Sequence, residues 1–211
     1  MNKYSEALKK HLACLLILIS GLFCGTAMAD SPQGGQELPY SYGFEDNNLA
    51  TDGWVLQGAT SANTGIRDDA VRTCSYVFKF CFSERNAYLL SPVLNSGANY
   101  VAVSFWYRAR SSSYPEKFQV GYTTDETVTD ASLFTYGEVV TTATESWQEY
   151  ENIFPAGTRR IAIKYVYTNA YYLFLDDFTF ESVTVSKELP YSYGFENKNL
   201  AADGWVLQGA T

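Results

Sequence analysis

Residues 37–60 read ELPYSYGFEDNNLATDGWVLQGAT, and residues 188–211 read ELPYSYGFENKNLAADGWVLQGAT. The two copies begin 151 positions apart and differ at three positions only, namely Asp46/Asn197, Asn47/Lys198 and Thr51/Ala202. A match of this length indicates a tandem repeat whose unit is about one domain long. The sequence therefore predicts one complete domain at residues 37–187 and the truncated start of a second repeat at residues 188–211.

The N-terminal segment has the pattern of a secretion signal over residues 1–29. Three lysines precede an apolar run at residues 12–23, and Ala27-Met28-Ala29 offers a cleavage point. The run is shorter than the ~20 apolar residues of a membrane anchor. A lipoprotein signal ending at Cys24 is the alternative, although the bulky residue before it disfavours that processing. Cleavage near Ala29 would export the chain and leave residues 30–36 as a polar linker.

The composition argues against several classes of function. A formal net charge of −8 disfavours a nucleic-acid partner, because an acidic chain repels phosphate. The single histidine, His11, lies in the signal, so the mature chain has no Ser-His-Asp triad, Cys-His pair or imidazole zinc site. Paired carboxylates could still serve a glycosidase, but that mechanism needs a cleft, and the sequence has few long loops to build one.

From residue 38 onward the sequence is typical of β-strands. Large apolar residues recur at every second position over residues 100–108, 118–122 and 161–167, and Gly, Asn, Asp and Ser cluster between the runs. Further elements are expected as strands at 38–45, 53–57, 87–94, 146–154 and 171–181, and as one helical turn at 126–134. Parallel strands need crossover helices, which this pattern lacks. We therefore predict an all-β, antiparallel two-sheet sandwich.

Two cysteines, Cys74 and Cys81, remain after signal cleavage and enclose the residues SYVFKF. In an exported protein this spacing favours a disulfide that closes a small hairpin. Such a short loop would contribute roughly 2–3 kcal/mol in the chain-entropy account of disulfides. A redox pair is the alternative, but the spacing is not C-x-x-C and no helix follows it.

Two acidic segments suggest a metal site. Glu45 and Asp46 end the first strand, and Asp176 and Asp177 lie in the last strand. In many sandwiches these strands are neighbours, and converging carboxylates suit calcium, which takes about six to eight oxygen ligands. Because successive strand residues face opposite ways, both aspartates reach one ion only through a bulge or a backbone contribution. The alternative is an ion pair of these aspartates with Arg159, Arg160 or Lys164.

Four tyrosines cluster around the turn at residues 168–170: Tyr165, Tyr167, Tyr171 and Tyr172. Tyrosine in a strand is usually half-buried, with its hydroxyl group at the surface. This cluster is denser than packing requires. Tyr167, Tyr171 and Tyr172 are therefore candidates for an exposed aromatic platform that stacks against sugar rings or contacts another protein.

Several motifs in a fixed order carry a resemblance to a known family. GFE and DGW are followed by YLLSPVLNSG, VSFWYRAR, FPAGTRRIAIKY and YLFLDDFTFES, which together span residues 38–182. This order resembles the cleaved-adhesin domains of gingipain-type haemagglutinin regions and the related choice-of-anchor J modules. The resemblance implies a jelly-roll sandwich that occurs in tandem on the bacterial cell surface. It also implies structural calcium, with Glu45, Asp176 and Asp177 at the matching positions; the Cys74/Cys81 pair is not part of the family pattern.

These observations favour a non-catalytic, secreted, calcium-stabilised adhesion module that binds a host protein or a glycan. The alternatives are a carbohydrate-binding module that accompanies an enzyme and a structural repeat of a surface stalk. The second repeat carries its own expectation. With no partner domain to cover them, residues 188–211 would either stay disordered or compete with residues 38–57 for one sheet position and give domain-swapped oligomers.

Overall fold

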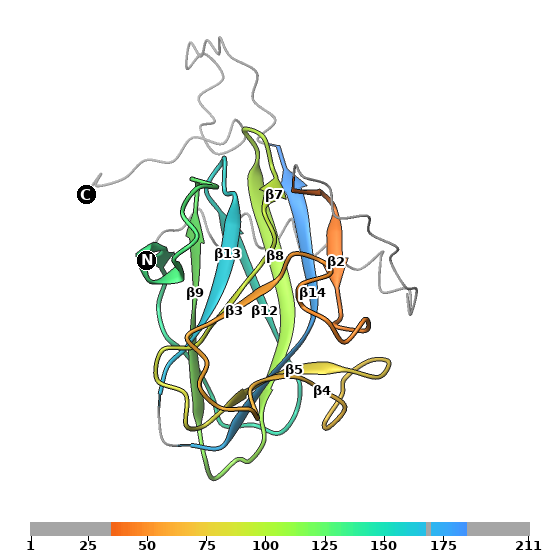
Figure 1. Cartoon of the computed structure of the whole chain (residues 1–211), viewed down its shortest axis with the longest axis vertical. Coiled ribbons are helices and arrows are strands. Elements are labelled where there is room, and N and C mark those ends of the chain that lie inside the picture. Colours follow the sequence, from red (N-terminus) through yellow and green to blue (C-terminus); the bar gives the residue numbers. More distant parts are fainter. Residues whose placement is uncertain (1–34, 168–169, 185–211) are drawn as a thin grey trace, which may run out of the picture.

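The computed structural model describes residues 35–167 and 170–184, which form a sandwich of two antiparallel sheets (Figure 1). The predicted all-β fold is therefore confirmed. The signal at residues 1–29 and the second repeat at residues 188–211, with the domain swap expected of it, lie outside the described residues. No helix in the described part of the chain is long and apolar enough to cross a membrane.

The first sheet contains six strands: β3 (Val55–Gln57), β6 (Tyr88–Leu90), β9 (Glu116–Thr123), β10 (Thr135–Tyr136), β11 (Val140–Thr142) and β13 (Arg160–Tyr165). Their order is β10-β9-β13-β6-β3, and β11 also pairs with β9. The second sheet contains β2 (Tyr40–Tyr42), β4 (Gly65–Arg67), β5 (Val77–Cys81), β8 (Tyr100–Ala109), β12 (Gln148–Phe154) and β14 (Tyr172–Val183). Its order is β12-β8-β14-β5-β4, with β2 also on β14. A short parallel pair joins β1 (Gln36–Glu37) to β7 (Leu94–Asn95).

The three alternating runs of the sequence became the strands β8, β9 and β13. Two expectations were wrong in detail. Residues 77–81 form the buried strand β5 rather than a hairpin. The helical turn expected at 126–134 is only the 3₁₀ turn η1 (Ala131–Leu133), whose N-cap is Asp130.

An aromatic core fills the space between the sheets. The ring of Phe178 stacks on Phe105 with centroids 4.6 Å apart, and Trp54 meets Phe178 edge to face at 5.0 Å. The indole N–H of Trp54 donates to the hydroxyl group of Tyr40 at 2.9 Å, so the buried ring leaves no polar group unpaired. Burial of each such ring contributes about 2–3 kcal/mol. The repeated GFE and DGW motifs therefore supply core residues of the sandwich, Phe44 and Trp54 among them.

A smaller core lies on the outer face of the first sheet. Residues from the 124–139 segment fold over that face, where Ala131 and Phe134 pack with Leu90 and Ala162. The side-chain amide of Gln57, on the edge strand β3, accepts from the backbone N–H of Ala131 at 3.1 Å. This segment therefore covers the outer face of the first sheet with its own apolar residues.

The longest strand, β14, organises the second sheet. One edge of β14 pairs with β8 along its length, whereas the other edge pairs first with β5 and then with β2. The register along β8 shifts between Asp176 and Thr179, which marks a β-bulge. Asp177 has a φ of 50°, a left-handed conformation that costs energy for a residue with a side chain. The bulge lies where β5 ends its pairing with β14 and β2 begins.

Candidate functional site

Three carboxylates meet at the bulge of β14, and we call Glu45, Asp176 and Asp177 the acidic junction. The chain leaves β2 just before Glu45 and enters β5 just after residue 76, so both segments reach the bulge. The prediction that the first and last strands are neighbours is confirmed by the pairing of β2 with β14. The bulge that both aspartates require is present as well. Glu45 therefore lies near Asp176 and Asp177 because β2 and β5 pair with β14 on either side of the bulge.

Hydrogen-bond donors of the 70–76 loop surround two of these carboxylates. Glu45 accepts from the backbone N–H groups of Ser75 and Tyr76 at 2.9 and 3.2 Å. Asp177 accepts from the hydroxyl group of Thr73 at 2.6 Å and forms an ion pair with Arg72. The guanidinium group of Arg72 also stacks on the Trp106 ring, 3.9 Å from its centroid.

The third carboxylate, Asp176, is fully buried. It accepts from the backbone N–H groups of Arg72 at 3.2 Å and Asp177 at 2.8 Å. Burial, followed by the neighbouring charge of Asp177, raises the pKa of Asp176 to about 8. Near neutral pH the Asp176 carboxyl group therefore holds a proton, and a bound cation would be an alternative way to neutralise it.

Asp46 lies apart from the acidic junction. Its carboxylate accepts from the Tyr42 hydroxyl group at 2.9 Å and the Asn48 backbone N–H at 3.1 Å, and it faces Asp52. Within residues 35–167 and 170–184, no group of three or more His, Cys, Asp or Glu side chains is placed so that it could hold a metal ion. The calcium site predicted from the sequence therefore stays a prediction.

The sequence-based ion pair had the wrong partners. Arg159 pairs with Glu126, Arg160 donates to the carbonyl group of Ser91 at 3.0 Å, and Lys164 lies over the ring of Tyr136. The cation beside Asp177 is Arg72, 105 residues away in the sequence. The strand pattern does not identify Arg72, because its loop has no periodicity that fixes which way it folds.

The predicted disulfide is absent from the described structure. Cys74 is exposed in the loop and Cys81 is buried at the end of β5. The strand between them is extended, and its five residues alone span about 13 Å. A disulfide requires Cα atoms within about 7 Å. The pair was misinterpreted because an apolar run between two cysteines can be a strand as easily as a hairpin.

A second cluster, at the start of β14, is aromatic. Tyr171 stacks on Tyr172 with ring centroids 4.4 Å apart, and Tyr114 and Phe82 flank this pair at 6.4 Å each. We call these four residues the aromatic tip. Three of them, Phe82, Tyr114 and Tyr171, are exposed large apolar side chains. The tip lies at the lower end of Figure 1, where β14 begins.

Two of the four predicted tyrosines therefore belong to the aromatic tip, and the other two are placed differently. Tyr165 is fully buried and stacks on Phe80, which makes it a core residue. Tyr167 is half-buried beneath the guanidinium group of Arg85, 4.0 Å from its ring centroid. Sequence reasoning missed Tyr114 and Phe82 because they lie in other loops, far from the tyrosine run.

Glu116, a buried carboxylate, anchors the tip. It accepts from the Tyr165 hydroxyl group at 2.7 Å and from the Tyr171 backbone N–H at 2.5 Å. Burial raises the pKa of Glu116, an effect that the two hydrogen bonds oppose. These bonds connect the end of the β8–β9 loop to the start of β14. The backbone of Tyr171 is thereby held in place before any ligand arrives.

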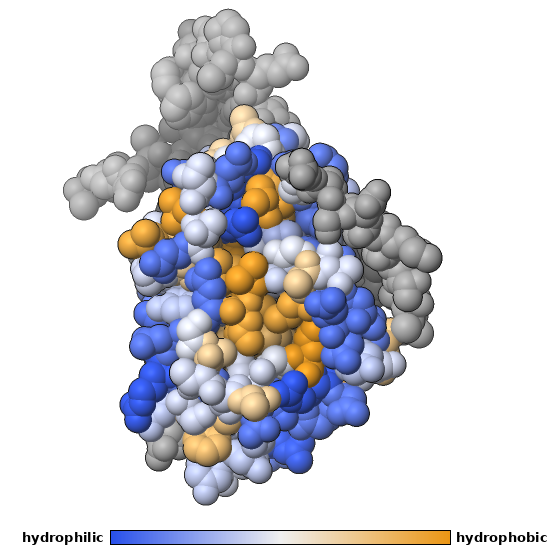
Figure 2. Space-filling model, in the orientation of Figure 1, coloured by the Kyte–Doolittle hydropathy of each residue, from blue (hydrophilic) through white to orange (hydrophobic). Residues whose placement is uncertain are grey.

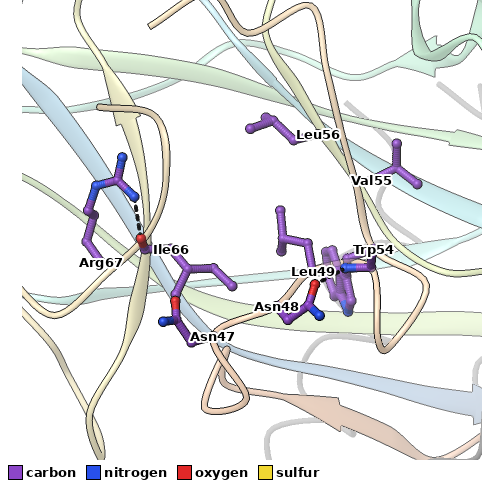
Figure 3. A pocket seen from close by; sticks show the side chains of 9 residues that line it. Asn47, Asn48, Leu49, Trp54, Val55, Leu56, Ile66 and Arg67 are labelled. Atoms are coloured by element: carbon purple, nitrogen blue, oxygen red, sulfur yellow. Dashed lines mark hydrogen bonds between the residues drawn. The ribbon is translucent and has the colours of Figure 1, made fainter. Parts of the chain in front are cut away.

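An open groove of about 540 Å³ lies beside the edge strand β3 (Figure 3). Its apolar lining comes from Leu49, Val55, Leu56 and Ile66, and apolar residues gather on this face in Figure 2. The one charged side chain in the lining, Arg67, donates to the backbone carbonyl groups of the preceding residue, Ile66, and of Ala62. The groove therefore offers apolar contact but few polar groups directed at a ligand.

Comparisons with known proteins show what the fold resembles. No protein-family model matches the sequence, and a search of curated proteins finds no match. Among solved structures, the K1 cleaved adhesin domain of Lys-gingipain from Porphyromonas gingivalis is similar, with a TM-score of 0.58 and 21% identity over 69% of this chain and 98% of that one. The K3 cleaved adhesin domain has a TM-score of 0.57 and 18% identity over 67% and 96%.

A xylan-binding domain is also similar. The CBM22-2 domain from Paenibacillus barcinonensis has a TM-score of 0.50 and 14% identity over 68% of this chain and 99% of that one. At these identities the comparisons show the fold alone. The described domain therefore has the jelly-roll fold of cleaved adhesin domains, as the sequence motifs predicted.

Proposed function

We propose that this domain is a non-catalytic extracellular adhesion module that binds a glycan or a host protein through the aromatic tip. The observation that carries the proposal is the exposure of three large aromatic side chains at one end of the sandwich, where Glu116 holds the backbone of Tyr171. A soluble domain ordinarily buries such rings unless they contact a partner. The similarity to adhesin domains and to a xylan-binding domain supports the same kind of function.

The chemistry of the acidic groups also argues for binding over catalysis. Asp177 is held by an ion pair, Asp176 is buried beneath the loop, and Glu45 is bound by backbone N–H groups. None of the three lies in the groove beside β3. A glycosidase needs two carboxyl groups that face each other across a substrate. We infer that these carboxylates organise the loop.

Calcium at the acidic junction is part of the proposal. Three carboxylates around one loop supply the oxygen ligands that calcium prefers. In the described structure Arg72 and backbone N–H groups supply the positive charge instead. We propose that calcium takes the place of Arg72 beside Asp177 and removes the proton from Asp176. The domain would then be stabilised by the ion at extracellular calcium concentrations.

The adhesion function can be tested with glycan and host-protein arrays. The wild-type chain is compared with Tyr171→Ala and with a matched control, Tyr100→Ala. The two tyrosines are exposed to the same degree, 40% and 39%, but Tyr100 begins β8 and pairs with the far end of β14. We expect Tyr171→Ala to lose binding and Tyr100→Ala to retain it. Equal binding by both variants would show that the aromatic tip is not the site.

A carbohydrate-binding module that accompanies an enzyme is the second candidate. The aromatic tip favours it too, because the apolar face of a sugar ring stacks on tyrosine. The same arrays separate the two functions. Ligands restricted to plant or microbial polysaccharides would indicate the accessory module, and host proteins or host glycans would indicate the adhesin.

A further inference from the structure

The charges around the aromatic tip differ from those of the rest of the molecule. The whole chain is acidic, with a formal net charge of −8. The described residues of three segments build the tip, at 82–87, 110–115 and, on either side of residues 168–169, at 166–167 and 170–171. Within these loops and Glu116, which follows the second one, the only carboxylates are Glu84 and Glu116, and both side chains are fully buried. The charges that these loops expose are therefore positive.

The two exposed positive charges of the described residues are both in these loops. Arg85 and Arg110 are exposed, whereas the other described lysines and arginines are half-buried or buried. Neither Arg85 nor Arg110 forms an ion pair with a carboxylate of the described residues. By contrast Arg72, Lys79 and Arg159 each pair with an acidic side chain.

A backbone contact places Arg110 next to the aromatic tip, and Arg85 lies in the same loop as the tip residue Phe82. The backbone N–H of Arg110 donates to the carbonyl group of Tyr172 at 2.9 Å, so the two residues are lateral neighbours. Arg85 lies three residues after Phe82 in one loop, and its guanidinium group stacks on Tyr167 at 4.0 Å. Stacking leaves the edges of a guanidinium group available for hydrogen bonds to an anion.

The buried carboxylates do not neutralise these arginines by direct pairing. Glu84 accepts from two backbone N–H groups and two hydroxyl groups of residues 60–64, which fully occupies it. Glu116 binds Tyr165 and Tyr171, as described above. Glu145, in the segment before β12, lies beside the 110–115 loop. Its side chain accepts from the backbone N–H of Ser112 at 3.1 Å.

We propose that the aromatic tip recognises an acidic glycan, whose sugar rings stack on the tyrosines while its carboxylate or sulfate groups bind Arg85 and Arg110. This inference rests on the proposed function, because it names the ligand class for the same site. Guanidinium groups bind planar anions through paired hydrogen bonds, and such charge-assisted bonds are about twice as strong as neutral ones. The acidic remainder of the surface repels a polyanion and directs it to this end of the molecule.

The test measures binding of the full chain to heparin and polygalacturonate, with dextran and xylan as neutral probes, at two salt concentrations. We expect the acidic polysaccharides to bind, and binding to weaken at least several-fold as salt rises. Arg110→Gln and Arg85→Gln should each lose roughly tenfold in affinity. Lys164→Gln is the control, because it changes the net charge equally on a half-buried lysine of β13.

The outcomes separate this inference from the proposed function. Salt-independent binding of the neutral probes that is lost in Tyr171→Ala would overturn the acidic-ligand inference and leave the tip as a glycan site. If Lys164→Gln and Arg110→Gln lose the same affinity for the acidic polysaccharides, the loss comes from the change in net charge alone. That result would also overturn the inference. No binding of any polysaccharide would overturn the inference, and the protein array would then decide whether the tip is an adhesion site at all.

Discussion

The carboxyl group of Asp52 lies against that of Asp46, and the two share a hydrogen bond in the turn between β2 and β3. Asp52 is buried and Asp46 is exposed. Both belong to the segment that the sequence repeats, but the second copy has Asn197 at the position of Asp46. The sequence therefore has two acids at these positions in the first copy and Asn197 and Asp203 in the second.

This pair makes the stability of the domain depend on pH. Burial, and then the hydrogen bond and charge of Asp46, raise the pKa of Asp52 to about 7 from its ordinary value of 3.8. The folded state therefore holds the proton more tightly than the unfolded state. Stability from this group is complete below about pH 4 and is lost as the pH rises to about 7.

Asp46→Asn, which reproduces the second copy, should reduce this loss because it removes one of the two charges. The expected gain is about 1 kcal/mol in unfolding free energy at pH 8, with little change at pH 4. Urea denaturation at both pH values measures it. Asp68→Asn serves as the control, because Asp68 is exposed and its substitution removes the same negative charge. Equal behaviour of the two variants would disprove the coupling.

The acidic junction makes a second prediction, about calcium. If calcium takes the place of Arg72, a chelator should lower the melting temperature of the wild-type chain by several degrees. Arg72→Gln should be destabilised by the loss of its ion pair and its stacking on Trp106, and calcium should restore most of that loss. Asp177→Asn should abolish the calcium effect. Identical melts with and without calcium would show that Arg72 is the permanent partner of Asp177.

The strands that the sequence identified share a strong local signal. Val101, Val103 and Phe105 recur at every second position, and β8 extends over that run because period-two patterns report which side chains face the core. The contact between the first and last strands followed from common topology. The first prediction depends on a pattern that a short window of sequence carries, and the second on the usual strand order of sandwiches.

The features that sequence reasoning missed depend on contacts between distant segments. Arg72 and Asp177 are 105 residues apart, and Glu116 binds the backbone of Tyr171, 55 residues away. No local pattern shows that Glu116 is buried, because a charged residue beside a Ser-rich loop has the composition of exposed surface. Such pairings become visible only when the sheet order is known.

A third prediction concerns Glu84, which is fully buried with four hydrogen bonds to residues 60–64. In Glu84→Gln the amide NH₂ would face one backbone N–H donor and one hydroxyl group; the hydroxyl group can turn to accept, but the bond from the backbone N–H would be lost and the charge would be removed from the rest. We expect a loss of about 2–4 kcal/mol in unfolding free energy at pH 7. Urea denaturation measures it, and Glu138→Gln, at an exposed position, is the control.

The pH dependence of the Glu84 effect provides an independent check. Hydrogen bonds from Thr64, Thr60 and Ser61 outweigh the opposing effect of burial and lower the pKa of Glu84. Its stabilising contribution is therefore present above the unfolded-state pKa of 4.5 and is lost as the pH falls through the lower folded-state value. The difference between wild type and Glu84→Gln should accordingly shrink in acid. A difference that stays constant with pH would mean that the charge of Glu84 does not matter.

The last prediction follows from the strand between Cys74 and Cys81. Because β5 holds the two thiols apart, a reductant should leave the melting temperature of the folded domain unchanged. Cys81 is buried and Cys74 is exposed, so a thiol reagent should modify Cys74 quickly and Cys81 only after denaturation. Mass spectrometry of peptides from labelled protein distinguishes these positions from Cys14 and Cys24. A melting temperature that falls in reductant, together with protection of Cys74 from the reagent, would mean that a disulfide forms and that the loop before β5 rearranges to allow it.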